Sequence, residues 1–238
     1  MSRDYRGKLD DTVRKKTLWM IKKLSLKQSW FDKKFLIDES SKMSRTDKVN
    51  MKNYLKILCI LLVIFFVNAD INAIALLIDA ITRSFAGDHE KATLFLNAYI
   101  YVFALVILFA GSIGKRVGRM KVFQWGVFYF ILGSLGCGIS RSANLAIFMR
   151  FIQGLGSATL WPNGVALIVN FLPTSCRGTA CAIFAGILGM SVGLGPYLGL
   201  WIANHSSWQW VFLINVPLIG VISLFLLVTS WDELEPRK

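Results

Sequence analysis

Residues 57–77 read ILCILLVIFFVNADINAIALL, an apolar stretch in which Asp70 is the only charged residue. This stretch belongs to the first of six long apolar runs in the chain. A hydrocarbon core of about 30 Å needs roughly 20 helical residues to cross it. Backbone groups in lipid must pair within their own segment, so runs of this length form helices. The runs do not alternate between polar and apolar residues, as the strands of a membrane β-barrel do.

The sequence therefore predicts an all-α membrane protein with six transmembrane helices. The expected spans lie at about 54–81, 92–114, 122–140, 145–171, 180–204 and 210–230. Hydrophobic residues make up 55% of the chain, more than a soluble domain usually carries. Around the six-span unit of residues 54–230, we expect a basic tail at 1–53 and a short end at 231–238.

The tail leaves three interpretations open. Its apolar residues partly follow one side of a helix, which is compatible with an amphipathic helix at the membrane surface. A loosely ordered tail held near anionic headgroups by its lysines is the simpler alternative. In the third interpretation, translation begins at Met43 or Met51 rather than at Met1, which leaves only a short leader.

Positive charge is unevenly placed along this chain, whose net charge is +13. Most lysines and arginines lie in the tail or between the second and third runs, where the sequence contains Lys115, Arg116, Arg119 and Lys121. The opposite side carries only Arg83, Lys91 and Arg141. The positive-inside rule then predicts that both termini are cytoplasmic. Because the excess charge has this topological cause, we expect no nucleic-acid partner.

Two charged residues, Asp70 and Arg150, fall deep inside the runs, whereas Lys56 and Asp79 lie near the ends of the first run. A carboxylate at the depth of Asp70 costs several kcal/mol unless it is paired, hydrated or protonated. Arg150 differs from it in depth by only about 7 Å, so a direct or water-bridged pair is possible. Arginine stays charged and would keep Asp70 ionised until a ligand or a movement separates them, which is how a proton-coupled switch behaves. The alternatives are a structural hydrogen bond for Asp70 and an interfacial, snorkelling Arg150.

Other polar and aromatic side chains inside the runs are candidates for a substrate path. They are Asn72, Asn97, Tyr99, Trp161 and Asn163. Such a group either binds substrate or bonds a neighbouring helix, and the sequence leaves both open. The four cysteines have no metal-binding or redox spacing. No nucleophile–base pair or phosphate loop is present, so we expect neither an enzyme nor a metal or cofactor.

Four motifs follow one another along the chain. They are Gly111-Ser-Ile-Gly-Lys-Arg-Val-Gly-Arg119, Arg150-Phe-Ile-Gln-Gly-Leu-Gly156, Gly193-Leu-Gly-Pro-Tyr-Leu-Gly199 and Trp208-Gln-Trp-Val-Phe-Leu-Ile-Asn-Val-Pro217. In this order they resemble G-x-L-A-D-R-x-G-R, R-x-x-Q-G-x-G, an antiporter motif ending G-P-x-x-G-G, and W-R-W-x-F-x-I-N-V-P. The chain thus resembles the N-terminal half of a major facilitator superfamily transporter. The most similar branch is the drug:proton antiporters with fourteen spans.

The resemblance implies roles for particular residues. Asp70 and Arg150 would couple transport to protons. The loop motif contributes Gly111, Lys115, Arg116, Gly118 and Arg119; the span-four motif contributes Arg150, Gln153, Gly154 and Gly156; the antiporter motif contributes Gly193, Gly195, Pro196 and Gly199. Four positions depart from the pattern: Lys115 replaces an aspartate, Leu200 a glycine and Gln209 an arginine, and Asp79 stands where a proline is usual in the first span.

By resemblance, the function is that of one half of a proton-coupled multidrug efflux antiporter in a bacterial inner membrane. Its partners would be the bilayer, a small amphipathic substrate and protons, with a second half or a second copy completing the path. The K-R-V-G form of the loop motif resembles pumps that work with a periplasmic adaptor. An inactive remnant, or a membrane sensor or anchor, is the alternative. We expect Asp70 and Arg150 to face the bundle interior, within reach of each other directly or through water. For an isolated half without its partner, we expect the same residues to face lipid or the missing partner. The sequence does not name the exported compound.

Overall fold

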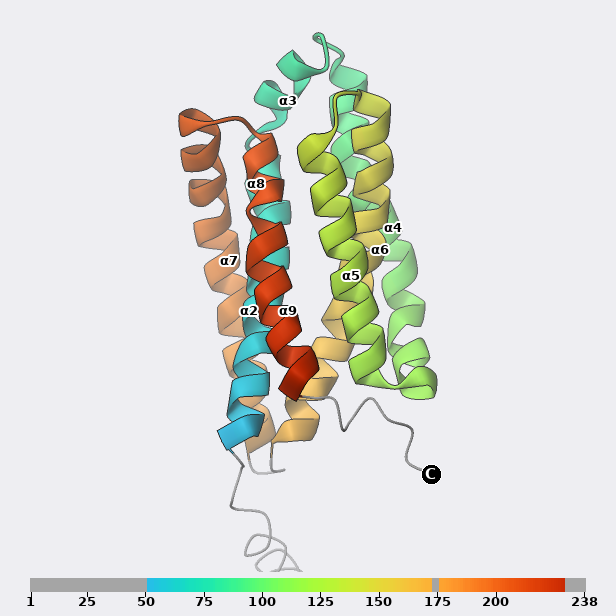
Figure 1. The fold of residues 1–238 in the computed structure, drawn as a ribbon, viewed down its shortest axis with the longest axis vertical. Coiled ribbons are helices and arrows are strands. Elements are labelled where there is room, and N and C mark those ends of the chain that lie inside the picture. The colour runs from blue at the N-terminus through green and yellow to red at the C-terminus, as the bar shows by residue number, and fades with distance from the viewer. Residues whose placement is uncertain (1–50, 173–175, 230–238) are drawn as a thin grey trace, which may run out of the picture. The chain divides into compact units, whose positions relative to one another are not determined.

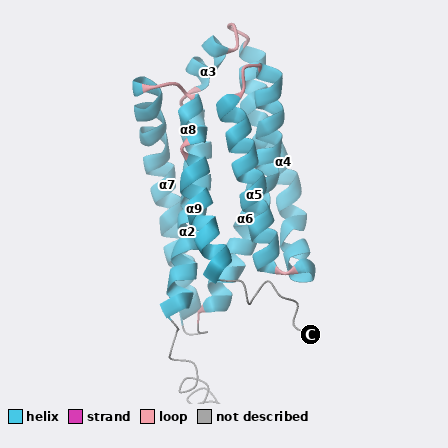
Figure 2. Ribbon diagram, viewed as in Figure 1, coloured by secondary structure: helices cyan, strands magenta, loops and turns pink. Residues whose placement is uncertain are grey.

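The structure is a computed structural model that describes residues 51–172 and 176–229. The predicted tail, apart from residues 51–53, and the predicted end at 231–238 lie outside the described residues. Within the described part of the chain every regular element is a helix, as Figure 2 shows. The all-α prediction is therefore confirmed for these residues.

In the part of the chain that the structure describes, six helices form the body of the fold and two further helices are short. The long helices are α2 (Met51–Ala75), α4 (His89–Val117), α5 (Arg119–Ile139), α6 (Ala143–Phe171), α7 (Arg177–His205) and α9 (Asn215–Thr229). The short helices are α3 (Ile78–Ser84) and α8 (Gln209–Leu213). Several helices extend past the predicted apolar runs into charged residues, because polar end residues continue the backbone hydrogen bonding outside the apolar segment.

Within residues 51–172 and 176–229, five helical segments are long and apolar enough to cross a membrane: α2, α4, α5, α7, and α8 together with α9. The helix α6 is just as long as α4 but is not among them, because Arg150, Gln153 and Asn163 lower its hydropathy. Those three side chains are buried against other helices. A helix enclosed by protein can carry such groups, whereas a helix facing lipid cannot.

The predicted first span, 54–81, is wrong at its C-terminal end. The helix α2 stops at Ala75, and α3 begins only at Ile78. Between them, the amides of Leu76 and Leu77 bond to carbonyls three residues back, at 3.3 Å and 2.9 Å, rather than four. This tighter turn ends α2, and Asp79 then lies exposed in the first turn of α3, where the helix dipole favours an acidic side chain.

The long helices of residues 51–229 form two groups, visible in Figure 1. On one side α6 packs against α4 and α5; on the other α2 packs against α7 and α9. The groups meet where α2 contacts α6 and where α5 contacts α8 and α9. The largest apolar core lies along this meeting line and includes Ile60, Ile64 and Phe123, all fully buried.

Glycines set how closely these helices approach. A Cβ atom at Gly156 of α6 would lie 2.6 Å from the carbonyl oxygen of Gly126 on α5. A Cβ at Gly195 of α7 would lie 2.7 Å from the carbonyl oxygen of Ala69 on α2. Both distances are shorter than real contacts allow, so these backbones pack directly against each other, as small residues permit in membranes.

Polar residues shape both ends of α4. At its start, the Asp88 side chain accepts a hydrogen bond from the Lys91 amide at 3.0 Å and caps the helix. At its end, Gly118 adopts a φ of +112° and turns the chain directly into α5. A residue with a side chain is strained at that angle, so the glycine of the loop motif is explained by backbone geometry.

Candidate functional site

Asp70 and Arg150 form a buried ion pair between α2 and α6. The Arg150 Nη1 lies 3.0 Å from the Asp70 Oδ2. The two residues are 3% and 1% exposed, respectively. Of the direct and water-bridged pairs that the sequence left open, the structure has the direct one, and the prediction that both side chains face the bundle interior is confirmed. The interfacial alternative for Arg150 is wrong. Charges removed from water this completely persist only when paired and hydrogen-bonded.

Amide side chains from two further positions complete the bonding of Asp70. Asn215, at the start of α9, donates through Nδ2 to Oδ1 at 2.8 Å. Gln153 of α6 donates through Nε2 to Oδ2 at 3.3 Å and to Ser134 Oγ on α5 at 2.8 Å. Its Oε1 accepts from Arg150 Nη1 at 2.6 Å. Each carboxylate oxygen of Asp70 thus accepts at least one charge-assisted hydrogen bond.

Three aromatic rings surround the guanidinium of Arg150. Its central carbon lies 4.9 Å from the ring centroid of Phe95, 5.2 Å from that of Tyr99 and 4.7 Å from that of Phe212. Phe95 and Tyr99 belong to α4, and Phe212 belongs to α8. Ring faces attract cations, so this aromatic cage stabilises the charge where water is excluded. The Arg150 Nε has no hydrogen-bond partner among the described residues.

The break between α8 and α9 places Asn215 beside Asp70. Pro217 has no backbone N–H and cannot bond back to Leu213, which favours an interruption of the helix near Ile214. Trp208, at the start of the same motif, is buried and donates to Ser84 Oγ at 2.9 Å. The fourth motif therefore fixes the C-terminal segment to α3 at one point and to Asp70 at another.

One expectation from the sequence is wrong. The isolated unit does not leave Asp70 and Arg150 uncovered, because α4, α5, α6 and α8–α9 of the same chain enclose them. The physical reason is that the partners of the pair all come from this one set of helices. The ion pair therefore gives no reason for instability of the unit on its own.

The motif glycines divide into packed and open positions. Gly154 and Gly156 of α6 meet the backbones of Tyr99 and Gly126. On α7, Gly199 packs against Ala73 of α2, whereas Gly193 of the same motif has open space around it. Pro196 is partly buried in α7, which continues through it.

In the loop motif, Gly111 packs near Pro162, and Lys115 and Arg116 are exposed in the last turn of α4. Arg119 begins α5 and is partly buried. The structure does not bring these three basic residues to the Asp70–Arg150 pair.

The five candidates for a substrate path lie in different surroundings. Tyr99 is 2% exposed and contacts Arg150, and Asn163 is buried where it donates to the Ala110 carbonyl at 3.3 Å. Asn72 donates to the Asn68 carbonyl at 2.6 Å. Trp161 packs edge-on against Phe103 at 5.6 Å between centroids. Asn97 lines a hollow of about 350 Å³ on α4 with His89, Glu90, Thr93, Leu94 and Tyr101.

Sequence reasoning missed two residues that bond to the candidate site. Asn215 and Ser134 were not nominated, although both are polar groups in apolar runs and Asn215 lies inside a quoted motif. The signal available was this polarity in a lipid-length run, which predicts a buried partner. A third contact, the hydrogen bond from Asn68 of α2 to Ser191 Oγ of α7, joins two helices away from Asp70.

These observations define a multi-helix membrane protein with a buried, hydrogen-bonded ion pair at the junction of its two helix groups. The sequence profile of the Major Facilitator Superfamily matches residues 58–238. The chain therefore belongs to that superfamily, whose members are transporters rather than enzymes. It is an integral, multi-pass membrane protein.

Relatives with drug-related names match the chain. Multidrug resistance protein 3 of Bacillus subtilis (strain 168) is 36% identical over 153 residues, covering 64% of this chain and 30% of that protein. Multidrug export protein EmrB of Escherichia coli (strain K12) is 32% identical over 160 residues, covering 67% of this chain and 31% of that protein. The chain thus spans about a third of the length of these relatives.

The fold is also found in solved structures. The proton:xylose symporter XylE bound to 6-bromo-6-deoxy-D-glucose superimposes with a TM-score of 0.65 at 12% identity, covering 74% of this chain and 44% of that chain. A peptide transporter, POT, in complex with sulfate gives a TM-score of 0.66 at 14% identity. At these identities the likeness supports the fold alone.

Proposed function

We propose that this chain supplies one six-helix unit of a proton-coupled multidrug efflux antiporter of the fourteen-span branch, in a bacterial inner membrane. The observation that carries the proposal is the enclosed Asp70–Arg150 pair, joined to Asn215 and Gln153. Relatives named for multidrug resistance and multidrug export support the substrate class, a small amphipathic compound.

In this proposal Asp70 carries the exchanged proton. Protonation removes the negative charge that Arg150 and the Asn215 and Gln153 amides bind. Arg150 then has no anionic partner at the site and is held only by Gln153 and the aromatic cage. Protonated and ionised Asp70 therefore stabilise a given helix arrangement to different extents. This difference in free energy biases the helices toward one arrangement or the other.

We further propose that a second six-helix unit completes the path, supplied by the same polypeptide, another chain or a second copy. Support comes from the apolar residues that α4 and α7 leave exposed, among them Leu105 and Leu108 of α4 and Tyr197 and Trp201 of α7. Alternating access requires two bodies that move about a shared site. A periplasmic adaptor is a further proposed partner.

The test is transport in liposomes with an imposed pH gradient. We expect dye efflux only when a second unit is present, and loss of efflux in Asp70→Asn and in Arg150→Ala. Asp79→Asn, an exposed carboxylate on α3, is the matched control and should leave efflux unchanged. Efflux that persists in proven monomers contradicts the need for a second unit. Absence of efflux with every second unit favours an inactive remnant.

We also propose that both termini face the cytoplasm, as the lysine and arginine asymmetry predicts. Single cysteines placed at positions 87 and 206 should react with an impermeant reagent added outside intact cells. Cysteines at 117 and 235 should react only after the membrane is opened. Labelling at 117 from outside contradicts this orientation.

A further inference from the structure

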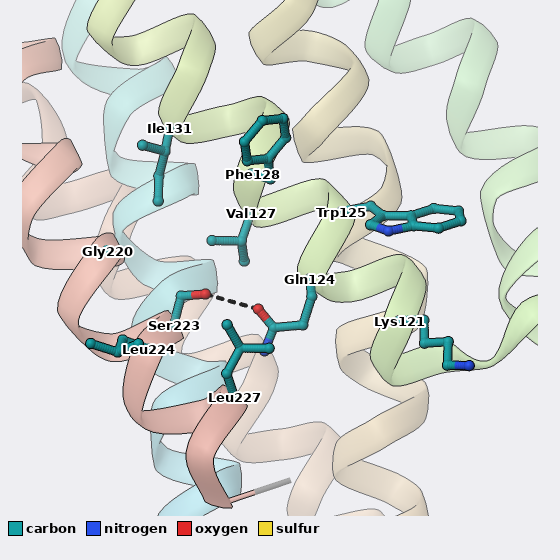
Figure 3. A pocket seen from close by; sticks show the side chains of 10 residues that line it. All are labelled: Lys121, Gln124, Trp125, Val127, Phe128, Ile131, Gly220, Ser223, Leu224 and Leu227. Atoms are coloured by element: carbon teal, nitrogen blue, oxygen red, sulfur yellow. Dashed lines mark hydrogen bonds between the residues drawn. The ribbon is translucent and has the colours of Figure 1, made fainter. Parts of the chain in front are cut away.

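An open groove lies between α5 and α9, away from the Asp70–Arg150 pair. Its volume is about 600 Å³, within the range of about 300–1,000 Å³ that small-molecule sites occupy. Its lining comprises Lys121, Gln124, Trp125, Val127, Phe128, Ile131, Gly220, Ser223, Leu224 and Leu227. Figure 3 shows these side chains and the two helices that carry them. No part of the proposed transport chemistry uses this groove.

The lining residues change from polar to apolar along the groove. Lys121 and Gln124 lie near one end, and Val127, Phe128 and Ile131 follow at helical spacing toward the other. In Figure 3 the Lys121 side chain extends from α5 away from α9, toward the end of the helix. A positive charge at one end of an apolar groove matches a molecule with an anionic head and an apolar tail.

A hydrogen-bonded polar pair, Ser223 and Gln124, lies between Lys121 and the apolar part of the groove. Ser223 donates to Gln124 Oε1 at 2.8 Å across the groove. The Gln124 Nε2 is buried and has no hydrogen-bond partner among the described residues. A buried donor without an acceptor is costly, and an ester carbonyl oxygen would relieve that cost. Gln124 is one helical turn from Lys121, as an ester lies next to a phosphate in a glycerophospholipid.

Charge around the groove points to the same ligand. The end of α4 adds Lys115 and Arg116, and the start of α5 adds Arg119, near the Lys121 end of the groove. Lys121 forms no ion pair within residues 51–172 and 176–229. Basic residues at a membrane surface attract anionic headgroups. We propose that the α5–α9 groove binds an anionic phospholipid, with its phosphate at Lys121, an ester at Gln124 and an acyl chain along Phe128 and Ile131.

Native mass spectrometry of the purified full-length chain tests this site. The chain is equilibrated in mixed micelles holding equal phosphatidylglycerol and phosphatidylcholine, and the retained lipid is counted. We expect preferential retention of phosphatidylglycerol. Lys121→Ala should reduce that retention about fivefold, the effect of one basic residue on an anionic lipid. Arg141→Ala, an exposed basic residue beyond the opposite end of α5, is the matched charge control and should change it little.

A second pair of variants separates groove occupancy from general adhesion. An added Cβ at Gly220 has no atom within 4 Å, so Gly220→Leu should fold and fill the groove. Gly186 of α7 is equally open and lies outside the groove, so Gly186→Leu is its control. We expect Gly220→Leu to abolish the retained phosphatidylglycerol and Gly186→Leu to keep it. Equal retention of both lipids, equal loss in the Lys121→Ala and Arg141→Ala variants, or retention in Gly220→Leu overturns the proposal.

Discussion

The helices α6 and α7 are both 29 residues long, both contain an internal proline, and both are rich in glycine, yet they lie in opposite environments. The buried residues of α6 include Arg150, Gln153 and Asn163. Those of α7 are only Ala180, Ser191, Gly195 and Gly199, all small. Length and composition therefore do not decide which helix becomes central. The positions of the polar residues, and whether partners exist for them, do.

The largest expected effect comes from disrupting the polar centre of α6, by which we mean Arg150 and Gln153 with their partner Asp70. Arg150→Ala leaves Asp70 buried without its charge partner and should lower the free energy of unfolding by about 3–5 kcal/mol. Reversible denaturation in mixed micelles measures it. The double variant Asp70→Leu with Arg150→Met removes both charges and should recover much of the loss. Equal destabilisation by the double variant would show that the pair itself, rather than the orphaned charge, stabilises the fold.

A smaller effect should follow from the contact that α9 makes with this centre. Asn215→Ala removes a hydrogen bond to a charged acceptor, worth about 1.5–3 kcal/mol. The same denaturation experiment measures the change. Asn170→Ala, an exposed amide near the end of α6, is the control and should be close to neutral. Similar values for the two asparagines would mean that Asn215 does not support Asp70.

Substitutions of glycine test the comparison between α6 and α7 directly. Gly156→Ala of α6 places a methyl group against the α5 backbone and should cost about 1–3 kcal/mol. Gly189→Ala of α7 meets open space and should gain about 0.5–1 kcal/mol, because alanine is the better helix former. Thermal unfolding of the two variants in one detergent gives both signs. If Gly189→Ala is also destabilising, α7 is in contact with a partner in the purified protein.

The smallest expected effect concerns the start of α4, outside the polar centre. The hydrogen bond from the Lys91 side chain to Asp88 lowers the pKa of that carboxyl below its usual value. The cap is therefore present above the unfolded-state pKa and lost as the pH falls through the lower folded-state value. Hydrogen exchange of the first turn of α4 should accelerate in that acidic window. Asp88→Asn should remove the dependence on pH, whereas Glu90→Gln should retain it.

The sequence predicted the features that the lipid environment imposes, but not which uncharged polar side chains bond at the site. The six apolar runs predicted the long helices, because lipid imposes a length and a backbone rule. The Asp70–Arg150 contact was predictable from depth and the cost of lone charges. The sequence did not single out Asn215 and Ser134 as members of the hydrogen-bond network around Asp70, because an amide or hydroxyl in an apolar run has many possible partners. The end of α2 at Ala75 was missed, because no proline or glycine marks the turn.

The pair was correctly predicted to face the bundle interior, but the expectation that one half alone leaves it uncovered failed for a physical reason. Sequence reasoning placed the two charges at the right depth but had no information on which helix faces turn toward them. The rings of Phe95, Tyr99 and Phe212 read as ordinary apolar residues, and only the fold shows that they surround Arg150.

The bonds around Asp70 have a mechanical consequence. They tie α2 and α9, from one helix group, to α6 and, through Gln153, to α5 of the other. Apart from this polar joint and the hydrogen bond from Ser223 of α9 to Gln124 of α5, the groups meet mainly through apolar packing. Apolar packing is non-directional and tolerates sliding better than hydrogen bonds do. While the joint is intact, the six helices should move as one rigid body. Neutralising a single carboxylate would therefore change the stiffness of the whole unit, not only its local charge.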